Sequence, residues 1–123
     1  MSQNNLAIIL SGGLGKRFDK NTPKQFFKIE ETSLLEIIVN KFLETKSFKK
    51  ILIIVHKDYY KMTKKIFNNS SIDFVKGGLT RQESVYNGLI KAKKLNVENV
   101  LIHDAARPLV TKKLILNILK NLD

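Results

Sequence analysis

The sequence contains no cysteine, which excludes disulfide bonds and thiolate metal sites. It also lacks any apolar run close to the roughly 20 residues that a membrane-spanning helix requires. Residues 1–5 are uncharged and mostly polar, whereas a secretory signal peptide begins with basic residues. These absences lead us to expect a cytoplasmic protein that does not associate with membranes.

Acidic residues are scarce relative to basic ones, with 11 Asp and Glu against 22 Lys and Arg, so the formal net charge is +11. Such a charge is compatible with a nucleic-acid-binding surface. However, the lysines are spread over the expected helix faces and do not form one stripe with aromatic residues. We therefore interpret them as a compositional bias and expect no nucleic-acid partner, while a basic RNA-binding domain is kept as an alternative. The positive field would still attract anionic substrates.

Strand-like and helix-like segments alternate along the 123 residues, which suffice for one domain with one core. Continuous apolar runs predict buried strands, and apolar residues at helical spacing predict amphipathic helices. The expected strands are residues 6–10, 51–55, 72–75 and 100–103, and the expected helices are 34–45, 58–67, 82–94 and 112–122. Ser33 is a suitable N-cap for the first helix, and Val85, Leu89 and Ala92 align along the third. The alternation predicts an α/β fold, a Rossmann-like, open, mostly parallel sheet with helices on both faces.

Ligands of open α/β sheets bind beyond the carboxyl ends of the strands, so the segments that follow the strands are the candidates for chemistry. The first segment combines Ser11, three closely spaced glycines and Arg17. The glycines are Gly12, Gly13 and Gly15. Glycines let the backbone present N–H groups to a polyanion, and a fixed cation neutralises its charge. The segment is not a dinucleotide fingerprint, because Phe18 replaces the third glycine, and it is not a P-loop, because Arg17 stands where Ser or Thr is needed.

The segment after the third expected strand has Gly77 and Gly78, followed by Arg81 and Ser84 at the start of a helix. An arginine there adds positive charge where the helix dipole is already positive, so the pattern favours a nearby anion or acceptor-rich ligand. The alternative is a simple turn followed by an ordinary surface arginine.

The segment after the fourth expected strand contains His103, Asp104 and Arg107. A carboxylate at a strand end can hold Mg²⁺ against substrate phosphates, but Asp104 could equally pair with Arg107, and the spacing leaves both possibilities open. We expect His103 to be structural and His56 to be a turn residue. No Ser/His/Asp or zinc-binding arrangement is evident in the sequence.

These segments, together and in this order, resemble the 2-C-methyl-D-erythritol 4-phosphate cytidylyltransferases of the non-mevalonate isoprenoid pathway. Four motifs carry the resemblance, and they span nearly the whole chain: residues 11–17, 23–25, 77–85 and 103–108. The ribitol-5-phosphate cytidylyltransferases share this layout but are less similar, because they tend to differ in the third and fourth motifs. The resemblance implies a fold of the nucleotide-diphospho-sugar transferase type.

Carried over position by position, the resemblance also implies a set of site residues. The implied nucleotide-binding residues are Ser11, Gly12, Gly13, Gly15, Gly78, Arg81, Ser84, Ala105 and Arg107, the catalytic cations are Arg17 and Lys24, and the Mg²⁺ ligand is Asp104. The glycine turn would wrap CTP, Gly78 and its neighbours would select the cytosine, and Ala105 would lie near the ribose. The implied reaction is attack by the 4-phosphate of methylerythritol phosphate on the α-phosphate of CTP, with pyrophosphate as the leaving group.

The sequence departs from the family in two respects. Ser11 and Gly12 stand where the family usually has two alanines, a mild change because mainly the backbone is used there. Family members also continue well beyond this length, and their later half supplies the sugar-phosphate site and the arm that forms the homodimer. We therefore expect residues 1–123 to be a single nucleotide-binding domain, the N-terminal half of a longer transferase. A non-catalytic CTP-binding fragment is the alternative.

Overall fold

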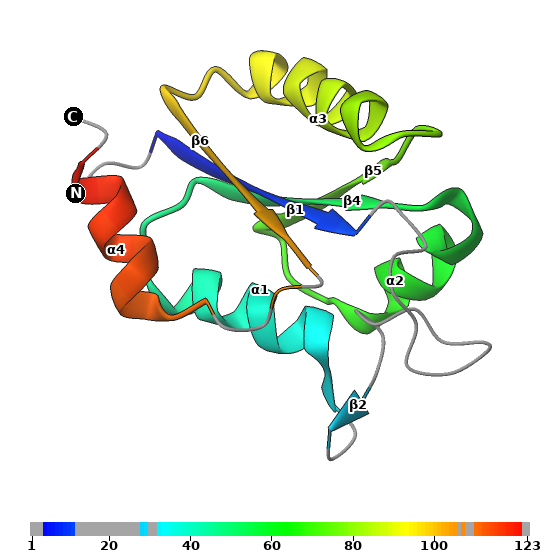
Figure 1. The fold of residues 1–123 in the computed structure, drawn as a ribbon, viewed down its shortest axis with the longest axis horizontal. Coiled ribbons are helices and arrows are strands. Elements are labelled where there is room, and N and C mark those ends of the chain that lie inside the picture. Colours follow the sequence, from blue (N-terminus) through cyan, green and yellow to red (C-terminus); the bar gives the residue numbers. More distant parts are fainter. Residues whose placement is uncertain (1–3, 12–27, 30–31, 106, 108–109, 122–123) are drawn as a thin grey trace.

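A four-stranded parallel sheet lies at the centre of the computed structural model, which describes residues 4–11, 28–29, 32–105, 107 and 110–121 (Figure 1). The strands are β1 (Asn5–Ser11), β4 (Lys50–Val55), β5 (Ile72–Lys76) and β6 (Asn99–Asp104). Their order across the sheet is β5-β4-β1-β6, and every neighbouring pair is parallel. Each residue of β1 is buried, as expected for the continuous apolar run at residues 6–10 that predicts a buried strand.

Helices cover both faces of this sheet, which confirms the predicted fold class. The helix α3 (Arg81–Leu95) packs on one face, whereas α1 (Leu34–Glu44), α2 (Tyr60–Ile66) and α4 (Lys112–Lys120) lie on the other (Figure 1). Successive side chains of a strand point to opposite faces, so β1 contributes to two separate apolar clusters. Ala7 and Ile9 pack on the side of α1, and Ile8 and Leu10 pack on the side of α3.

The helix α1 begins at the N-cap that the sequence predicts. The backbone N–H of Glu36 donates to Ser33 Oγ at 3.1 Å, and the N–H of Ser33 donates to Glu36 Oε1 at 3.0 Å. This reciprocal pair satisfies two N–H groups that would otherwise lack partners at the start of the helix.

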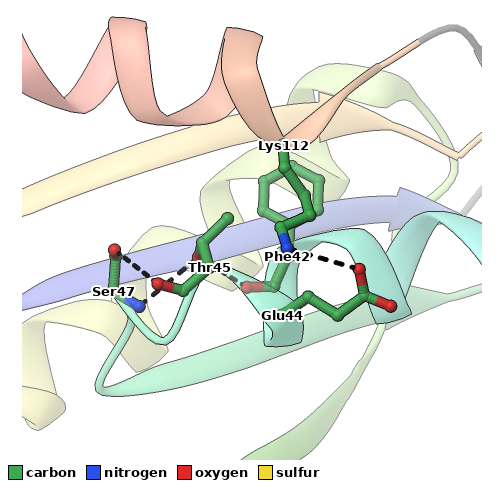
Figure 2. Close-up of polar contacts among 5 residues, drawn as sticks. All are labelled: Phe42, Glu44, Thr45, Ser47 and Lys112. Carbon is green, nitrogen blue, oxygen red and sulfur yellow. Dashed lines mark hydrogen bonds and ion pairs between the residues drawn. The ribbon is translucent and has the colours of Figure 1, made fainter.

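The end of α1 is fixed by short-range hydrogen bonds and by α4 (Figure 2). Thr45 Oγ1 donates to the carbonyl of Phe42 at 2.7 Å, and Ser47 Oγ donates to the carbonyl of Thr45 at 3.0 Å. Lys112, the first residue of α4, places Nζ 3.8 Å from Glu44 Oε1. Both side chains of this pair are exposed, so the fully buried Ile115 contributes more to holding α4 in place.

Two local features differ from the sequence prediction. The segment expected to be a helix over residues 58–67 starts with a 3-10 turn (Lys57–Tyr59), because His56 Nδ1 accepts the N–H of Asp58 at 3.1 Å. A small antiparallel pair, β2 (Lys28–Ile29) with β3 (Thr32–Ser33), was not predicted, since two-residue strands carry no periodicity.

The helix α3 packs its small residues directly against the sheet. Its buried side consists of small residues, Ser84, Gly88 and Ala92, while Leu89 is 43% exposed. A Cβ atom placed on Gly88 would lie only 2.5 Å from Cδ1 of Ile54 in β4. Across the described part of the chain, none of the helices combines the length and apolar character needed to cross a bilayer.

Candidate functional site

The carboxyl ends of β1 and β6 lie side by side, and the helices connected to these two strands lie on opposite faces of the sheet. The helix that follows β1 along the chain, α1, lies on one face of the sheet, and the helix that precedes β6, α3, lies on the other. Leu10 pairs in register with Asp104, and the N–H of Ala105 donates to the carbonyl of Leu10 at 2.9 Å. Such a switch point is where open α/β sheets bind their ligands.

The turn before α3 is held by a network of hydrogen bonds around Glu83. Thr80 Oγ1 accepts the N–H of Glu83 at 3.1 Å, and Glu83 Oε1 accepts the N–H groups of Leu79 and Thr80 at 2.8 and 3.2 Å. The N–H of Gly78 donates to Ser84 Oγ at 3.0 Å, and Ser84 is buried. A Cβ atom on Gly78 would collide with the Cβ of Glu83, so this turn requires glycine.

Three charged residues from the third and fourth motifs meet at the carboxyl end of β6. Arg81 Nη2 lies 3.7 Å from Asp104 Oδ2, and Arg107 Nε lies 3.9 Å from the same oxygen. Asp104 points to the α3 side, because its register partner Leu10 packs in the apolar cluster of that face. The anion expected near Arg81 is therefore supplied by the chain itself, and the pairing of Asp104 with Arg107 is also present.

Asp104 supplies a single carboxylate, which suits a metal ion that is also bound by a ligand. It does not make a complete metal site with other side chains among the described residues. Among the described residues, no three His, Cys, Asp or Glu side chains gather into a group that could hold a metal. Mg²⁺ is commonly bound by one or two carboxylates together with substrate phosphates. One carboxylate at a strand end beside two arginines is compatible with that donor set.

Both histidines act as structural residues, as the sequence led us to expect. His103 Nε2 lies 2.9 Å from the carbonyl of Arg107, and because a carbonyl only accepts, Nε2 carries the proton. The ring of His103 also packs against Phe42, with centroids 5.8 Å apart. His103 therefore fixes the loop that carries Arg107, a role that the sequence pattern did not predict. His56 caps the turn after β4 and donates its backbone N–H to the carbonyl of Ser11 at 3.3 Å.

The remaining expected site residues fall into two groups. Ser11 and Ala105 are buried at the strand ends, and Ser11 Oγ has no hydrogen-bond partner in the described part of the chain. Ser11 also follows Leu10 on β1, so its side chain points to the face opposite Asp104. The others, Gly12, Gly13, Gly15, Arg17 and Lys24, lie outside the described residues.

Comparison with known proteins identifies the family. Residues 6–123 match the family model of IspD, 2-C-methyl-D-erythritol 4-phosphate cytidylyltransferase. A cytidylyltransferase of that name from Thermosipho melanesiensis is 43% identical over 124 residues, which cover 97% of this chain and 53% of the relative. A bifunctional IspD/IspF enzyme from Pelagibacter ubique is 40% identical over 119 residues, covering 97% of this chain and 32% of the relative.

A solved structure leads to the same conclusion. The 4-diphosphocytidyl-2C-methyl-D-erythritol synthase from Anaerococcus prevotii superposes with a TM-score of 0.82 at 28% identity, over 98% of this chain and 51% of that one. The chain thus spans about half the length of the Thermosipho melanesiensis and Anaerococcus prevotii proteins. On the family match and these similarities, the chain belongs to the 2-C-methyl-D-erythritol 4-phosphate cytidylyltransferase (IspD) family.

Proposed function

We propose that the chain binds CTP beyond the carboxyl ends of β1 and β6, as the nucleotide-binding portion of a cytidylyltransferase. The enzyme would join CTP to 2-C-methyl-D-erythritol 4-phosphate, giving 4-diphosphocytidyl-2-C-methyl-D-erythritol and pyrophosphate. The observation that carries the proposal is the ion pair between Arg81 and Asp104, which joins two motifs that are distant in sequence at the ligand-binding edge of the sheet.

The chemistry needs positioning and charge rather than a covalent enzyme intermediate. An oxygen of the 4-phosphate attacks the α-phosphorus of CTP, and the bond from that phosphorus to the bridging oxygen breaks, which releases pyrophosphate. Negative charge on the phosphate oxygens must be stabilised during this step. We assign that role to Arg17 and Lys24 and the wrapping of the phosphates to the backbone of the glycine turn at residues 11–15.

The described residues support recognition of the nucleoside. Gly78 and Ser84 form a rigid turn at the start of α3, and the Ser84 hydroxyl retains its own proton to donate after accepting from Gly78. We assign this turn, with Arg81, to the cytosine, and Ala105 to the surroundings of the ribose. Arg107 supports the loop because its backbone carbonyl accepts a hydrogen bond from His103.

Asp104 is the residue that we propose to hold Mg²⁺. When bound, the ion would neutralise part of the triphosphate charge and polarise the phosphoryl group under attack. Substrates other than CTP, and the homodimer that the family resemblance implies, would involve the portion of the relatives' length that this chain does not match.

Two measurements test the proposal. Thermal unfolding with and without CTP and MgCl₂ reports binding, and release of pyrophosphate is then assayed with methylerythritol phosphate or ribitol 5-phosphate as the acceptor. We expect CTP to raise the melting temperature, and release with methylerythritol phosphate would support the full reaction. Protection without release would support the alternative of CTP binding without catalysis. The absence of any CTP effect would contradict the proposal.

Arg17→Ala tests the assignment of the main catalytic cation. In a chain that releases pyrophosphate, we expect kcat/KM to fall. The fall should correspond to a loss of about 3 kcal/mol of transition-state stabilisation, the scale of one preorganised charge contact. Lys50→Ala is the control, since Lys50 is the first residue of β4, at the end of the strand away from the candidate site, and pairs with Asp73. Near-normal turnover in Arg17→Ala would remove Arg17 from this role.

A further inference from the structure

Asp104 is shared between two cations that reach it from different elements. Arg81 is the first residue of α3, Arg107 lies in the loop after β6, and both guanidinium groups approach Oδ2 of Asp104, at 3.7 and 3.9 Å. These distances are longer than hydrogen bonds, so charge attraction, and not directional bonding, holds the three groups together. The cluster carries one net positive charge.

The two guanidinium groups are accessible, although their backbones are fixed. The Arg81 side chain is 65% exposed and that of Arg107 is 81% exposed, whereas that of Asp104 is 34% exposed. The capping box of Thr80 and Glu83 fixes the backbone at Arg81, and His103 holds the carbonyl of Arg107. The carboxylate of Glu83 is engaged with the backbone of its own turn and does not neutralise either arginine.

We propose that Arg81 and Arg107 form a binding site for a phosphate-bearing anion, and that Asp104 competes with that anion while no divalent cation is bound. A guanidinium group presents paired N–H donors that match phosphate oxygens, so both arginines can exchange a carboxylate oxygen for a phosphate oxygen. A divalent cation at Asp104 would release the arginines, which couples cation binding to anion binding. Such coupling is reciprocal, because each ligand raises the affinity of the other equally.

This inference rests on the proposed function, since it takes Asp104 as the cation ligand and a phosphate group as the anion. It assigns a different partner to Arg81, which would contact phosphate and not only the cytosine. The consequence is opposite to the usual expectation for a metal ligand: without metal, loss of the Asp104 charge should strengthen anion binding.

The test uses inorganic pyrophosphate as the probe, in metal-free buffer with a chelator, and isothermal titration calorimetry on the whole chain. We expect Asp104→Asn to bind pyrophosphate about three- to tenfold more tightly than the unmodified chain, the range expected from releasing two exposed ion pairs. Asp73→Asn is the matched control, because Asp73 is 33% exposed and pairs with Lys50 at 3.5 Å at the far edge of the sheet. It raises the net charge equally and should change the affinity much less.

A double variant identifies the groups responsible. Arg81→Gln added to Asp104→Asn should abolish most of the gain, and the melting temperature of each variant shows whether the fold is intact. Equal pyrophosphate affinity in Asp104→Asn and Asp73→Asn, or no binding by either, would overturn the inference. Pyrophosphate lacks the base and the ribose, so this result is independent of whether CTP itself binds.

Discussion

Arg81 shows how a single residue can satisfy a local requirement in a way that its sequence context does not reveal. Its position at the start of α3 is unfavourable for a positive charge and therefore predicts a nearby anion. The structure supplies that anion from the chain, because Asp104 lies 3.7 Å away at the end of β6. The need for a counter-charge follows from the helix, whereas its source depends on how the helix is placed against the sheet.

Ser11 and Ser33 provide a residue-level prediction, since both are buried serines in opposite situations. Ser11 Oγ lacks a hydrogen-bond partner among the described residues, whereas Ser33 Oγ caps α1. An unsatisfied buried polar group costs about 1–3 kcal/mol, so we expect Ser11→Ala to raise the free energy of unfolding by about 1 kcal/mol or more. Ser33→Ala should lower it by about 1 kcal/mol through loss of the cap. Urea denaturation measures both, and a loss of stability in Ser11→Ala would show that its hydroxyl has a partner.

At the level of elements, the sequence predicted the main strands and helices because their apolar patterns are strong. Boundaries moved by only a few residues; the third helix, for example, was expected over residues 82–94 and is observed as Arg81–Leu95. Its orientation was harder to predict, because its tight contact with the sheet depends on Gly88 lying against Ile54, a residue far away in the sequence. The short β2–β3 pair was missed because neither strand has enough residues to show a pattern.

The two glycines of this region lead to a prediction at the element scale. At Gly78, an added Cβ meets the Cβ and backbone of Glu83, which cannot move without breaking the capping box. We expect Gly78→Ala to destabilise the protein by about 1–3 kcal/mol, as overpacking does. At Gly88, the added Cβ meets the terminal methyl group of Ile54 and no backbone atom, and alanine favours the helix by up to about 1 kcal/mol, so the net loss should be smaller. Chemical denaturation of both variants tests the order, and a larger loss at Gly88 would contradict it.

For the whole molecule, the alternation of strands and helices predicted a parallel sheet but not the strand order β5-β4-β1-β6. That order depends on which face of the sheet α3 covers on the way from β5 to β6, and no local sequence pattern predicts that face. The order is what brings Asp104 next to β1 and across from Arg81. The candidate site is thus partly predictable: motifs identify its residues, and topology decides their contacts. The roles of Arg17 and Lys24, which lie outside the described residues, stay predictions.

The net charge of +11 gives a prediction for the molecule as a whole. An excess of like charge destabilises the compact state, and added salt screens that repulsion, whereas the described ion pairs are largely exposed and contribute little. We expect the melting temperature to rise by roughly 2–5 °C between about 10 and 200 mM NaCl, as the screening length shortens. A variant with Lys61, Lys65 and Lys113 replaced by glutamate should show a smaller rise. A melting temperature that falls with salt would mean that ion pairs dominate the electrostatics.

The central position of β1 also has a consequence for the order in which the protein is assembled during translation. β1 is made first, yet one of its two flanks is completed by β6, and the bond from Asn99 Nδ2 to Asn5 Oδ1 joins residues 94 positions apart. Pairing over such a separation is slow and comes late, whereas β4 and β5 can pair soon after synthesis. Asp104 therefore reaches Arg81 only when β6 has emerged from the ribosome and docked against β1. A nascent chain can collapse around β1, β4 and β5 well before β6 docks, so ligand protection would report the docking of β6 rather than mere compaction.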